Sequence, residues 1–364
     1  MPSSSTLTKA VILVGGHGVR LQPLSYYIPK PMMPLLNRPF LEHIIAYLAK
    51  FEVTDITLAL SYLPELIRSH LGDGSNLGVQ LHYTVEDSPL GTAGAVKNAN
   101  RYLDSTFAVL NGDIFTDLNI ADMLAFHQHK KAKVTIALTW VDNPCAFGVV
   151  ETDSEDRVRR FTEKPNTNKV TTHWINAGIY ILEPEILRHI PVSSYYMFER
   201  GLFPLLLKLN EPVYGYPFRG YWLDMGTPEK YLCLNCDLLL AKMSSPLTPG
   251  LGQNSVCCEK DATVHPSAKI TGPVVIGSRC RIDQRARIEG PVIIGEDCYV
   301  GEDTSIEKAI LWQGISIGAG ASLKGCIIGS NTRIEEGKQV TNRIVTLDHT
   351  GLPGESYLRA DEAG

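Results

Sequence analysis

Residue types that bind phosphate follow the first apolar run of the chain. The run AVILV is long enough for one buried strand and too short for a buried helix. Three glycines come directly after it: Gly15, Gly16 and Gly18. Glycines after a strand let backbone N–H groups approach a phosphate closely. Arg20 follows, and then Lys30, which lies between two prolines. Together these residues predict a receptacle for a polyphosphate.

The complete pattern is more specific than its glycines. A lone G-G-x-G would also fit a turn without a ligand, but here the chain reads G-G-x-G-x-R-L-x-P-L-S and then P-K-P. It is neither a Walker loop nor the dinucleotide motif. It resembles the signature of the sugar-1-phosphate nucleotidyltransferases, or NDP-sugar pyrophosphorylases. Val19 departs from that signature, because the family usually has Thr or Ser there, so we expect backbone N–H groups to replace the hydroxyl.

Strand-like and helix-like segments alternate beyond this loop. Helical patterns cover residues 40–51, 63–71 and 91–103, and strand patterns cover residues 55–60, 79–85, 107–110 and 134–141. The alternation predicts right-handed βαβ units in an α/β, Rossmann-like domain with a mostly parallel sheet. Ligands of such sheets bind beyond the carboxyl ends of the strands, where the glycine loop and Asp113 are both expected.

Two aspartates are candidates for binding a metal. Asp113 ends the turn Asn-Gly-Asp after a buried strand, and Asp224 lies in the stretch YWLDMGTP. By resemblance they are the two carboxylates that hold Mg²⁺, which prefers one or two carboxylates, waters and phosphate oxygens. The alternative for Asp224 is a helix cap, since a helix is expected to open at Pro228.

The resemblance also assigns the substrate-binding residues. Lys164 of the stretch TEKP would contact the sugar phosphate, and the sugar hydroxyls would be read by Gly148 (through its backbone), Glu163 and Asn176. The nucleotide would be bound by Leu13, Gly15, Gly16, Gly18, Glu86, Gly91 and Thr92. Arg20 and Lys30 would hold the leaving pyrophosphate.

Glu86 carries the prediction of the base. Relatives that use thymidine or uridine triphosphates commonly have Gln at this position, five residues before Gly91. A carboxylate only accepts hydrogen bonds, which suits the two adjacent donors of guanine better than the edge of uracil. The alternative is a solvated strand end. The stretches PLGTAG, FHQHKK, INAGIYIL and WLDMGTPEKY most resemble the mannose-1-phosphate guanylyltransferase branch of the family.

The resemblance therefore implies a reaction between GTP and mannose-1-phosphate that gives GDP-mannose and pyrophosphate. An anionic phosphate oxygen attacks the α-phosphorus, so positioning and charge neutralisation dominate and no general base is needed. UTP or dTTP with glucose-1-phosphate remains an alternative. A second alternative is a regulatory subunit that binds nucleotide sugar without making it, although Lys30, Asp113, Lys164 and Asp224 are all present.

The C-terminal part repeats every six residues. Apolar residues recur at 264, 270, 276, 282, 288, 294, 300 and 306, and after one slip at 317, 323, 328 and 334. This period predicts a β-solenoid with three short strands to a coil, and it resembles the left-handed parallel β-helix of hexapeptide repeats, with about four coils. Such domains also make acyltransferases, but His265 is the only histidine within the repeats. We expect a structural domain whose bare end coils are covered in a homo-oligomer.

Composition and cysteine usage limit the class of protein. The 364 residues are 44% hydrophobic and 20% charged with a net charge of −5, which predicts a globular chain of two domains without a nucleic-acid partner. No apolar stretch suits a membrane span or a signal peptide, so we expect a cytoplasmic protein with reduced thiols. Cys233 and Cys236 form a C-x-x-C inside a helical pattern, residues 228–243, and are expected to pack on a helix face. The expected boundaries are a disordered lead at 1–8, a nucleotidyltransferase domain at 9–243, a linker at 244–260, a left-handed β-helix at 261–346 and a tail at 347–364.

Overall fold

The computed structural model describes residues 7–16, 18–167, 170–248, 251–252, 254–347 and 353–358. The chain divides into two compact units. In the described residues, unit 1 comprises 7–16 and 44–224, and unit 2 comprises 18–43 and 225–358. Most of the predicted disordered lead and much of the predicted tail, residues 1–6, 348–352 and 359–364, lie outside the described residues.

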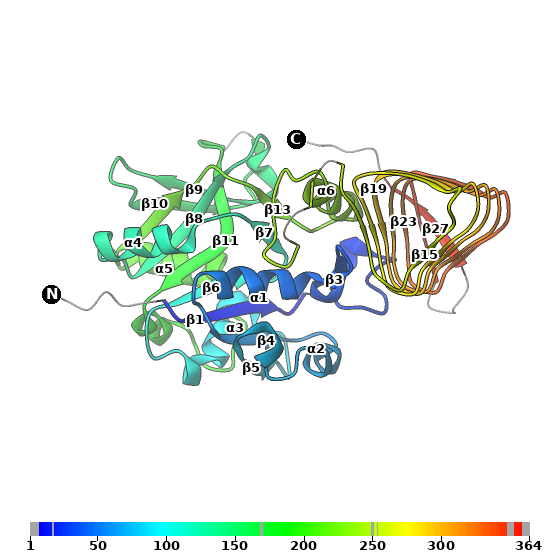
Figure 1. Ribbon diagram of the computed structural model, residues 1–364. Helices are drawn as coiled ribbons and strands as arrows, with labels where there is room; N and C mark the ends of the chain where they lie inside the picture. The colour runs from blue at the N-terminus through cyan, green and yellow to red at the C-terminus, as the bar shows by residue number, and fades with distance from the viewer. Residues whose placement is uncertain are drawn as a thin grey trace. The chain divides into compact units, whose positions relative to one another are not determined.

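Unit 1 is built on a nine-stranded mixed sheet, which confirms the predicted α/β class. One path through the sheet runs β10-β9-β11-β6-β1-β4-β5, and β8 and β12 extend it beside β11 (Figure 1). The parallel strands at one side are β1 (Lys9–Val14), β4 (Asp55–Leu60), β5 (Gln80–Val85) and β6 (Phe107–Asn111). The others are β8 (Val134–Trp140), β9 (Gly148–Thr152), β10 (Val158–Glu163), β11 (Trp174–Leu182) and β12 (Val213–Pro217). Strand β11 is antiparallel to both β6 and β8.

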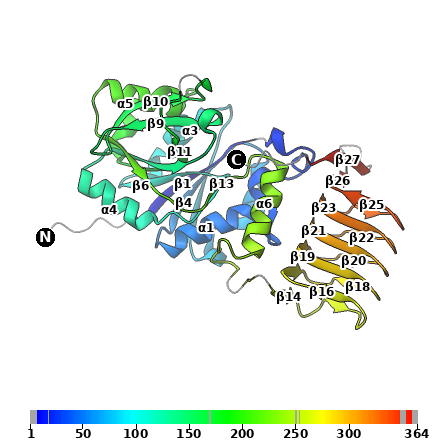
Figure 2. The same ribbon diagram turned by 90° about the horizontal axis from the view of Figure 1, so that it is seen from above.

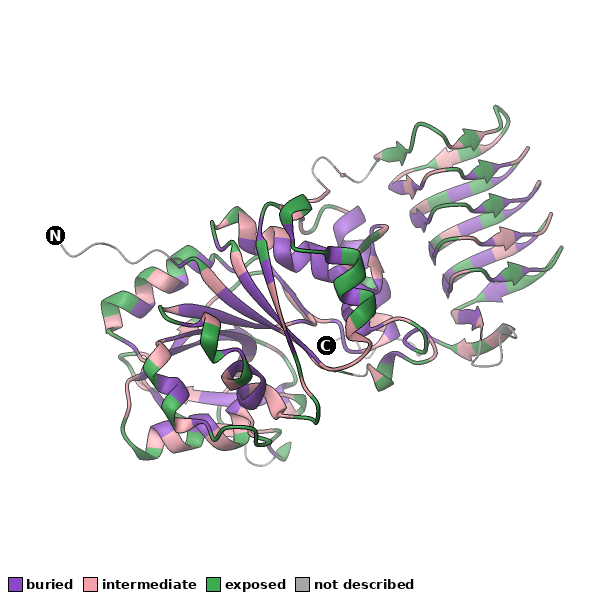
Figure 3. Cartoon of the chain, turned by 90° about the horizontal axis from the view of Figure 1, so that it is seen from below, coloured by how far each residue is buried: buried purple, intermediate pink, exposed green. Residues whose placement is uncertain are grey.

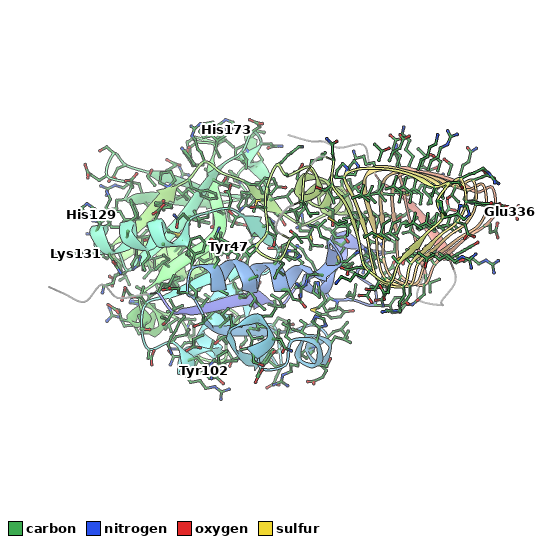
Figure 4. All side chains as sticks on the ribbon, in the orientation of Figure 1. Tyr47, Tyr102, His129, Lys131, His173 and Glu336 are labelled. Carbon is green, nitrogen blue, oxygen red and sulfur yellow. The ribbon has the colours of Figure 1, made fainter. Side chains whose placement is uncertain are left out.

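Five α-helices connect these strands in the described residues, and the apolar periodicity predicts the first three of them but not the last two. They are α1 (Phe40–Lys50), α2 (Pro64–Leu71), α3 (Gly91–Asn98), α4 (Ile120–Lys130) and α5 (Phe203–Lys208), the last preceded by the π-helix Phe198–Leu202. The α3 prediction was too long, because the helix ends at Asn98 and a 3-10 turn, Asn100–Tyr102, takes its place. Asparagine competes for backbone groups near that end, which favours a turn over a continued helix. Tyr47 on α1, labelled in Figure 4, donates a hydrogen bond to the Leu118 carbonyl oxygen at 2.7 Å.

An aromatic cluster lies at the centre of the unit 1 core. Tyr180, Phe198 and Phe203 are buried, and their ring centroids are 5.1 to 5.4 Å apart. Offset or edge contacts at this spacing add roughly 1 kcal/mol each to the burial of the rings. The buried faces of the strands appear in purple in Figure 3. The cluster therefore fixes β11 against the π-helix.

Unit 2 contains the predicted solenoid as a parallel β-helix (Figure 2). Strand β15 (Thr263–Val264) pairs with β18 (Arg281–Ile282), so Thr263 meets Arg281, 18 residues further on. Later coils are shorter: Ser316 in β22 (Ser316–Ile317) meets Arg333 in β24 (Arg333–Ile334), 17 residues further on. The predicted slip after residue 306 is therefore confirmed, as one residue lost per coil.

One wall of the β-helix has five strands in the described chain, against the expected four coils. They are β15, β18, β20 (Tyr299–Val300), β22 and β24. The other walls contain β14 (Val256–Cys258), β16 (Lys269–Thr271), β17 (Val274–Ile276), β19 (Arg287–Ile294), β21 (Ser305–Leu311), β23 (Ser322–Ile328), β25 (Gln339–Thr341), β26 (Arg343–Leu347) and β27 (Pro353–Tyr357). The first coil begins at Val256, inside the expected linker. The six-residue period did not reveal it, because its exposed strand has two cysteines and no apolar residue at the repeat position.

The two ends of the β-helix differ. At the C-terminal end, β27 pairs antiparallel with β26. At the N-terminal end, the described partners of β14, β15 and β16 all lie on one side, in the following coil. Val256 in this first coil is 45% exposed, whereas the corresponding apolar residues of later coils are buried. The first coil thus offers a free strand edge within the described chain.

Helix α6 (Pro228–Leu239) packs on the β-helix within unit 2. Trp312 donates its indole N–H to the Tyr231 hydroxyl at 2.9 Å, and both side chains are buried. Cys236 is also buried, which raises the pKa of its thiol to about 12, whereas Cys233 is exposed. The prediction that these two cysteines pack on a helix face is therefore confirmed for Cys236 and wrong for Cys233. The helix ends four residues before the predicted Met243. None of the helices in the described residues is long and apolar enough to cross a membrane.

Candidate functional site

The carboxyl ends of the four parallel strands meet at one edge of the unit 1 sheet. Val14 is opposite Leu60, Leu60 is opposite Val85, and Leu13 is opposite Asn111. The residues that follow these strands are therefore brought together: Gly15 and Gly16 after β1, Glu86 after β5, and Gly112 and Asp113 after β6. This is the edge at which the sequence predicts the ligand.

Gly112 allows β6 to turn closely past β1. Its N–H donates to the Leu13 carbonyl oxygen at 2.9 Å, and a Cβ at Gly112 would lie 2.6 Å from that oxygen. A side chain cannot occupy this space without moving the backbone. The close approach holds Asp113 beside the end of β1, where the predicted phosphate loop begins.

A two-stranded ribbon brings Asp224 to the same place. Asp224 in β13 (Trp222–Asp224) pairs with Ile114 in β7 (Ile114–Thr116), the residue after Asp113. Trp222 secures the ribbon, because its indole N–H donates to the Ala177 carbonyl oxygen of β11 at 2.9 Å. Neither strand was predicted, since three residues are too few to show a period.

Asp224 does not cap α6. Thr227 is the N-cap of that helix, and its hydroxyl accepts a hydrogen bond from the Lys230 N–H. Asp224 pairs with the residue that follows Asp113, so the two residues are candidates for a shared cation site. Their carboxylates are the hard oxygen donors that Mg²⁺ prefers. No group of three or more Asp, Glu, His or Cys side chains in the described residues is placed to hold a metal. A cation at this pair would complete its coordination with waters and substrate oxygens, so the donor set fits Mg²⁺.

Glu86 begins the predicted base-binding loop. Its Oε2 accepts a hydrogen bond from the Leu90 N–H at 3.0 Å, and its own N–H donates to the Leu60 carbonyl oxygen at 3.0 Å. Half-burial raises the pKa of the Glu86 carboxyl above its usual value, and the Leu90 hydrogen bond partly offsets this. The side chain is therefore a fixed element of the loop and not a solvated strand end.

Gly148 and Glu163 lie opposite each other at the end of the β9–β10 ladder. A Cβ at Gly148 would lie 2.9 Å from Oε2 of Glu163 and 2.6 Å from the Phe161 ring. Lys164 follows directly in a left-handed conformation, φ 46°, and its N–H donates to the Phe147 carbonyl oxygen at 3.0 Å. Gly148 and the TEKP stretch, predicted from two separate parts of the sequence, are thus brought together.

Asn176 opens an irregular stretch in β11. Its Oδ1 accepts from the Gly178 N–H at 3.0 Å and its Nδ2 donates to the Tyr180 hydroxyl at 2.8 Å. Ile175 beside it pairs with Val149, so Asn176 is close in register to Gly148. One amide N–H of Asn176 is left over from these two bonds and can face a ligand.

Three predicted residues belong to unit 2. Gly18 has φ 62°, and a Cβ there would lie 3.2 Å from Cβ of Lys30. Lys30 is buried at the start of a 3-10 turn after Pro29. Arg20 is exposed. Val19 is 65% exposed, so its replacement of the usual hydroxyl leaves an apolar side chain at the surface of this loop.

Sequence reasoning gave no role to Glu199 or Trp222, and it did not predict the aromatic group of Trp140, His173 and Trp174 near Asn176. Trp140 stacks on His173, labelled in Figure 4, with ring centroids 4.9 Å apart and planes 16° apart. The Arg219 guanidinium lies 5.7 Å from the Trp140 ring centroid. These aromatic residues could not be predicted from the sequence, because Trp140 and Trp174 meet only through the pairing of β8 with β11, and the apolar periodicity does not show which strands pair.

Comparisons with known proteins agree with this arrangement. The family model described as "Nucleotidyl transferase" matches residues 9–240, and the model described as "EIF2B subunit epsilon LbH domain" matches residues 253–352, in accord with the predicted left-handed β-helix. A protein of Mycobacterium tuberculosis named mannose-1-phosphate guanylyltransferase is 38% identical over 322 residues, 88% of this chain and 82% of its own. One of Debaryomyces hansenii named mannose-1-phosphate guanyltransferase is 37% identical over 356 residues, 96% of this chain and 94% of its own. The solved structure of HddC from Yersinia pseudotuberculosis complexed with GMP-PN superposes with a TM-score of 0.55 at 31% identity, covering 63% of this chain and 98% of HddC.

Proposed function

Because this chain belongs to the nucleotidyl transferase family, we propose that it transfers the guanylyl group of GTP to mannose-1-phosphate, giving GDP-mannose and pyrophosphate. The names of the Mycobacterium and Debaryomyces relatives support this choice of substrates, as does the guanine nucleotide analogue in the HddC complex. The proposal is supported by the placement of the predicted residues in unit 1. Glu86 and Asp113 both follow strands at the same edge of the sheet, and Asp224 pairs beside Asp113. The part of β11 that contains Asn176 extends past the end of β6 at this edge, with Gly148 and Glu163 on the adjoining β9–β10 ladder.

Glu86 is proposed to select the base. A carboxylate has about four lone-pair sites, so one hydrogen bond from Leu90 leaves capacity for the N1–H and N2–H donors of guanine. The edge of uracil has a single donor between two carbonyl oxygens, and those oxygens would repel the carboxylate. The Leu90 bond fixes the direction of the carboxylate before the nucleotide binds.

Positioning and charge neutralisation are the proposed work of the other residues. Lys164 holds the attacking sugar phosphate, whose oxygen is already anionic, and Gly148, Glu163 and Asn176 orient the sugar. Arg20 and Lys30 keep their predicted role at the leaving pyrophosphate, with Gly15, Gly16 and Gly18 supplying N–H groups and Gly91 and Thr92 shaping the base loop. Asp113 and Asp224 would hold Mg²⁺, which neutralises phosphate charge when bound.

A homo-oligomer formed through the β-helix is part of the proposal. The first coil presents strand edges and the half-exposed Val256, a surface that a second copy of the chain would cover. We also propose a cytoplasmic location, because all eight cysteines carry free thiols, which suits a reducing compartment.

A substrate matrix tests the function. ATP, GTP, UTP and dTTP are each combined with mannose-1-phosphate and glucose-1-phosphate, and pyrophosphate release is measured. GTP with mannose-1-phosphate should give the highest kcat/KM. Preference for UTP or dTTP would overturn the choice of base, tight GDP-mannose binding without pyrophosphate release would indicate a regulatory subunit, and turnover of acyl-CoA would indicate an acyltransferase.

A further inference from the structure

A turn before the π-helix is bonded onto the N-terminus of α3. The N–H groups of Ala93 and Gly94 donate to the Tyr196 carbonyl oxygen at 3.0 and 2.9 Å, and the Tyr196 N–H donates to the Leu90 carbonyl oxygen at 2.7 Å. Gly91 has φ 71°, and a Cβ there would lie 2.8 Å from the Tyr196 oxygen. The proposed base loop and this turn therefore form one rigid piece.

Thr92 extends this connection to a carboxylate. Its hydroxyl accepts from the Phe198 N–H at 2.9 Å and donates to Oε2 of Glu199 at 3.1 Å. A hydroxyl has one hydrogen to donate, and Thr92 gives it to Glu199. Thr92 thus holds the Glu199 side chain in one direction. The carboxylate lies in a π-helix, an irregular form that is frequent at functional sites.

Glu199 lies among the residues that the proposed function assigns to the sugar. Burial raises the pKa of its carboxyl above the usual value, and the charge of nearby Glu163 adds to this. Burial is the main cause that raises the pKa of the Tyr180 hydroxyl, and the charges of Glu199 and Glu163 raise it further. The same hydroxyl accepts a hydrogen bond from the Asn176 side-chain amide. The Tyr180 ring packs on Phe198, the residue before Glu199, with ring centroids 5.1 Å apart, and β10, which ends at Glu163, contacts the π-helix. Glu199, Glu163, Tyr180 and Asn176 therefore form one cluster of polar side chains beside β11.

The cluster has more acceptors than donors. Within the described part of the chain neither Glu163 nor Glu199 forms an ion pair. Two nearby carboxylates without a paired cation are unfavourable until hydrogen-bond donors reach them. The hydroxyl groups of a sugar are such donors, and they carry no charge that would need a countercharge.

We propose that Glu199 is a specificity-determining residue of the sugar site, where its carboxylate and that of Glu163 accept hydrogen bonds from sugar hydroxyls. This inference rests on the proposed function. Thr92, assigned from sequence to the nucleotide, acts on the sugar by orienting Glu199. Because Thr92 also belongs to the base loop, the base and the sugar are positioned by one connected set of hydrogen bonds.

The test compares Glu199→Gln with the wild-type full-length chain in steady-state kinetics. A site that hydrogen-bonds a substrate hydroxyl discriminates strongly, so we expect the KM for mannose-1-phosphate to rise about tenfold and the preference over glucose-1-phosphate to fall about tenfold. The KM for GTP should stay within about twofold of wild type. Glu185→Gln, at an exposed carboxylate bonded to Lys133, is the matched control and should be unchanged.

Two variants of Thr92 separate orientation from folding. Thr92→Ser keeps the hydroxyl and should retain the sugar preference, whereas Thr92→Val should reproduce the Glu199→Gln defect. Thermal unfolding confirms that each variant is folded. If the wild type makes GDP-mannose but Glu199→Gln changes every KM equally, or changes none, the inference is overturned. A wild type that makes no GDP-mannose overturns the proposed function instead; if another sugar phosphate is used, the same comparison is made with it.

Discussion

Asp224 lies opposite Ile114 in the ladder between β13 and β7, so its backbone is one step in register from that of Asp113. The two carboxylates come from positions 111 residues apart in sequence, and a ribbon of three residues on each side brings them together. Trp222 anchors that ribbon to β11 through its indole N–H. The proposed metal pair and sugar-reading strand are therefore parts of one rigid assembly.

The first prediction concerns this pair. Asp113→Asn and Asp224→Asn should each lower kcat at least about 100-fold, because each removes negative charge needed to hold a divalent cation at the phosphates. Excess Mg²⁺ should partly restore the rate if affinity is the main loss. Asp122→Asn, at an exposed position on α4, is the control. Near-normal rates in both variants would exclude the assignment.

The second prediction separates two lysines. Lys164→Ala should mainly raise the KM for the sugar phosphate, and Lys30→Ala should mainly raise the KM for GTP and, in the reverse direction, for pyrophosphate. A lost charge contact to phosphate should cost about tenfold to 100-fold in affinity. Steady-state kinetics in both directions measure the split. The same loss for every substrate in both variants would show that the two roles are not divided.

The third prediction concerns assembly. Val256→Lys places a charge on the exposed edge of the first coil, where positive charge opposes strand pairing. Light scattering of the full-length protein should show a lower-order species than wild type. Lys324→Glu, on a later coil, is the control for a change of charge. A wild type that is monomeric at micromolar concentration would refute assembly through this end.

The fourth prediction is a pH dependence of stability. His43 is buried, its Nδ1 is 2.7 Å from the Ser245 hydroxyl and its Nε2 is 2.9 Å from the Leu35 carbonyl oxygen. Burial lowers the pKa of His43 from 6.5 to about 4. The unfolded chain therefore takes up the proton first, and the free energy of unfolding should fall as the pH decreases from about 6.5 to about 4, by up to about 3 kcal/mol.

The free energy of unfolding, measured by denaturant unfolding of the full-length chain across that pH range, shows the effect of His43. His43→Gln removes the titrating group and should flatten this part of the curve, while His265→Gln, at an exposed position, should leave the curve unchanged. An identical slope in wild type and His43→Gln would assign the pH dependence to other groups.

The sequence predicts the site best where a short motif coincides with the end of a regular element. Gly15 and Asp113 follow strands with apolar runs, and Glu86 follows a strand with an alternating pattern, so their placement at strand ends could be predicted. Glu199 could not, because its importance comes from Thr92, 107 residues away, and from a π-helix that has no sequence period. Long-range pairs of polar side chains depend on how elements pack, which local patterns do not contain.

For the β-helix, too, the sequence pattern predicts only part of the structure. From Ile276 onward, the residues predicted by the six-residue period are buried in the walls, because each coil repeats the same inward position. Val264 and Ile270, the first two residues of the period, are only partly buried. The period does not reveal the first coil, because the residues of its first strand are exposed and need not be apolar. The different ends of the solenoid could be recognised only from the pairing of β26 with β27.

The last prediction concerns the choice of base by Glu86. Glu86→Gln keeps an oxygen that can accept from the Leu90 N–H, so the loop should retain its conformation. The amide adds a donor that faces the guanine donors unfavourably and suits a uracil carbonyl oxygen. We expect the ratio of kcat/KM for GTP to that for UTP to fall about 100-fold, as for other sites that read a hydrogen-bonding edge.

The protonation of Glu86 gives an independent readout. Half-burial raises the pKa of its carboxyl, so the acceptor form is lost as the pH falls, and this begins at a higher pH than for an exposed glutamate. The KM for GTP should therefore rise on acidification in wild type, and this rise should be absent in Glu86→Gln, which does not titrate. Glu65→Gln, at an exposed position on α2, serves as the control. If Glu86→Gln kept both the preference for GTP and the acid rise in KM, another residue would select the base.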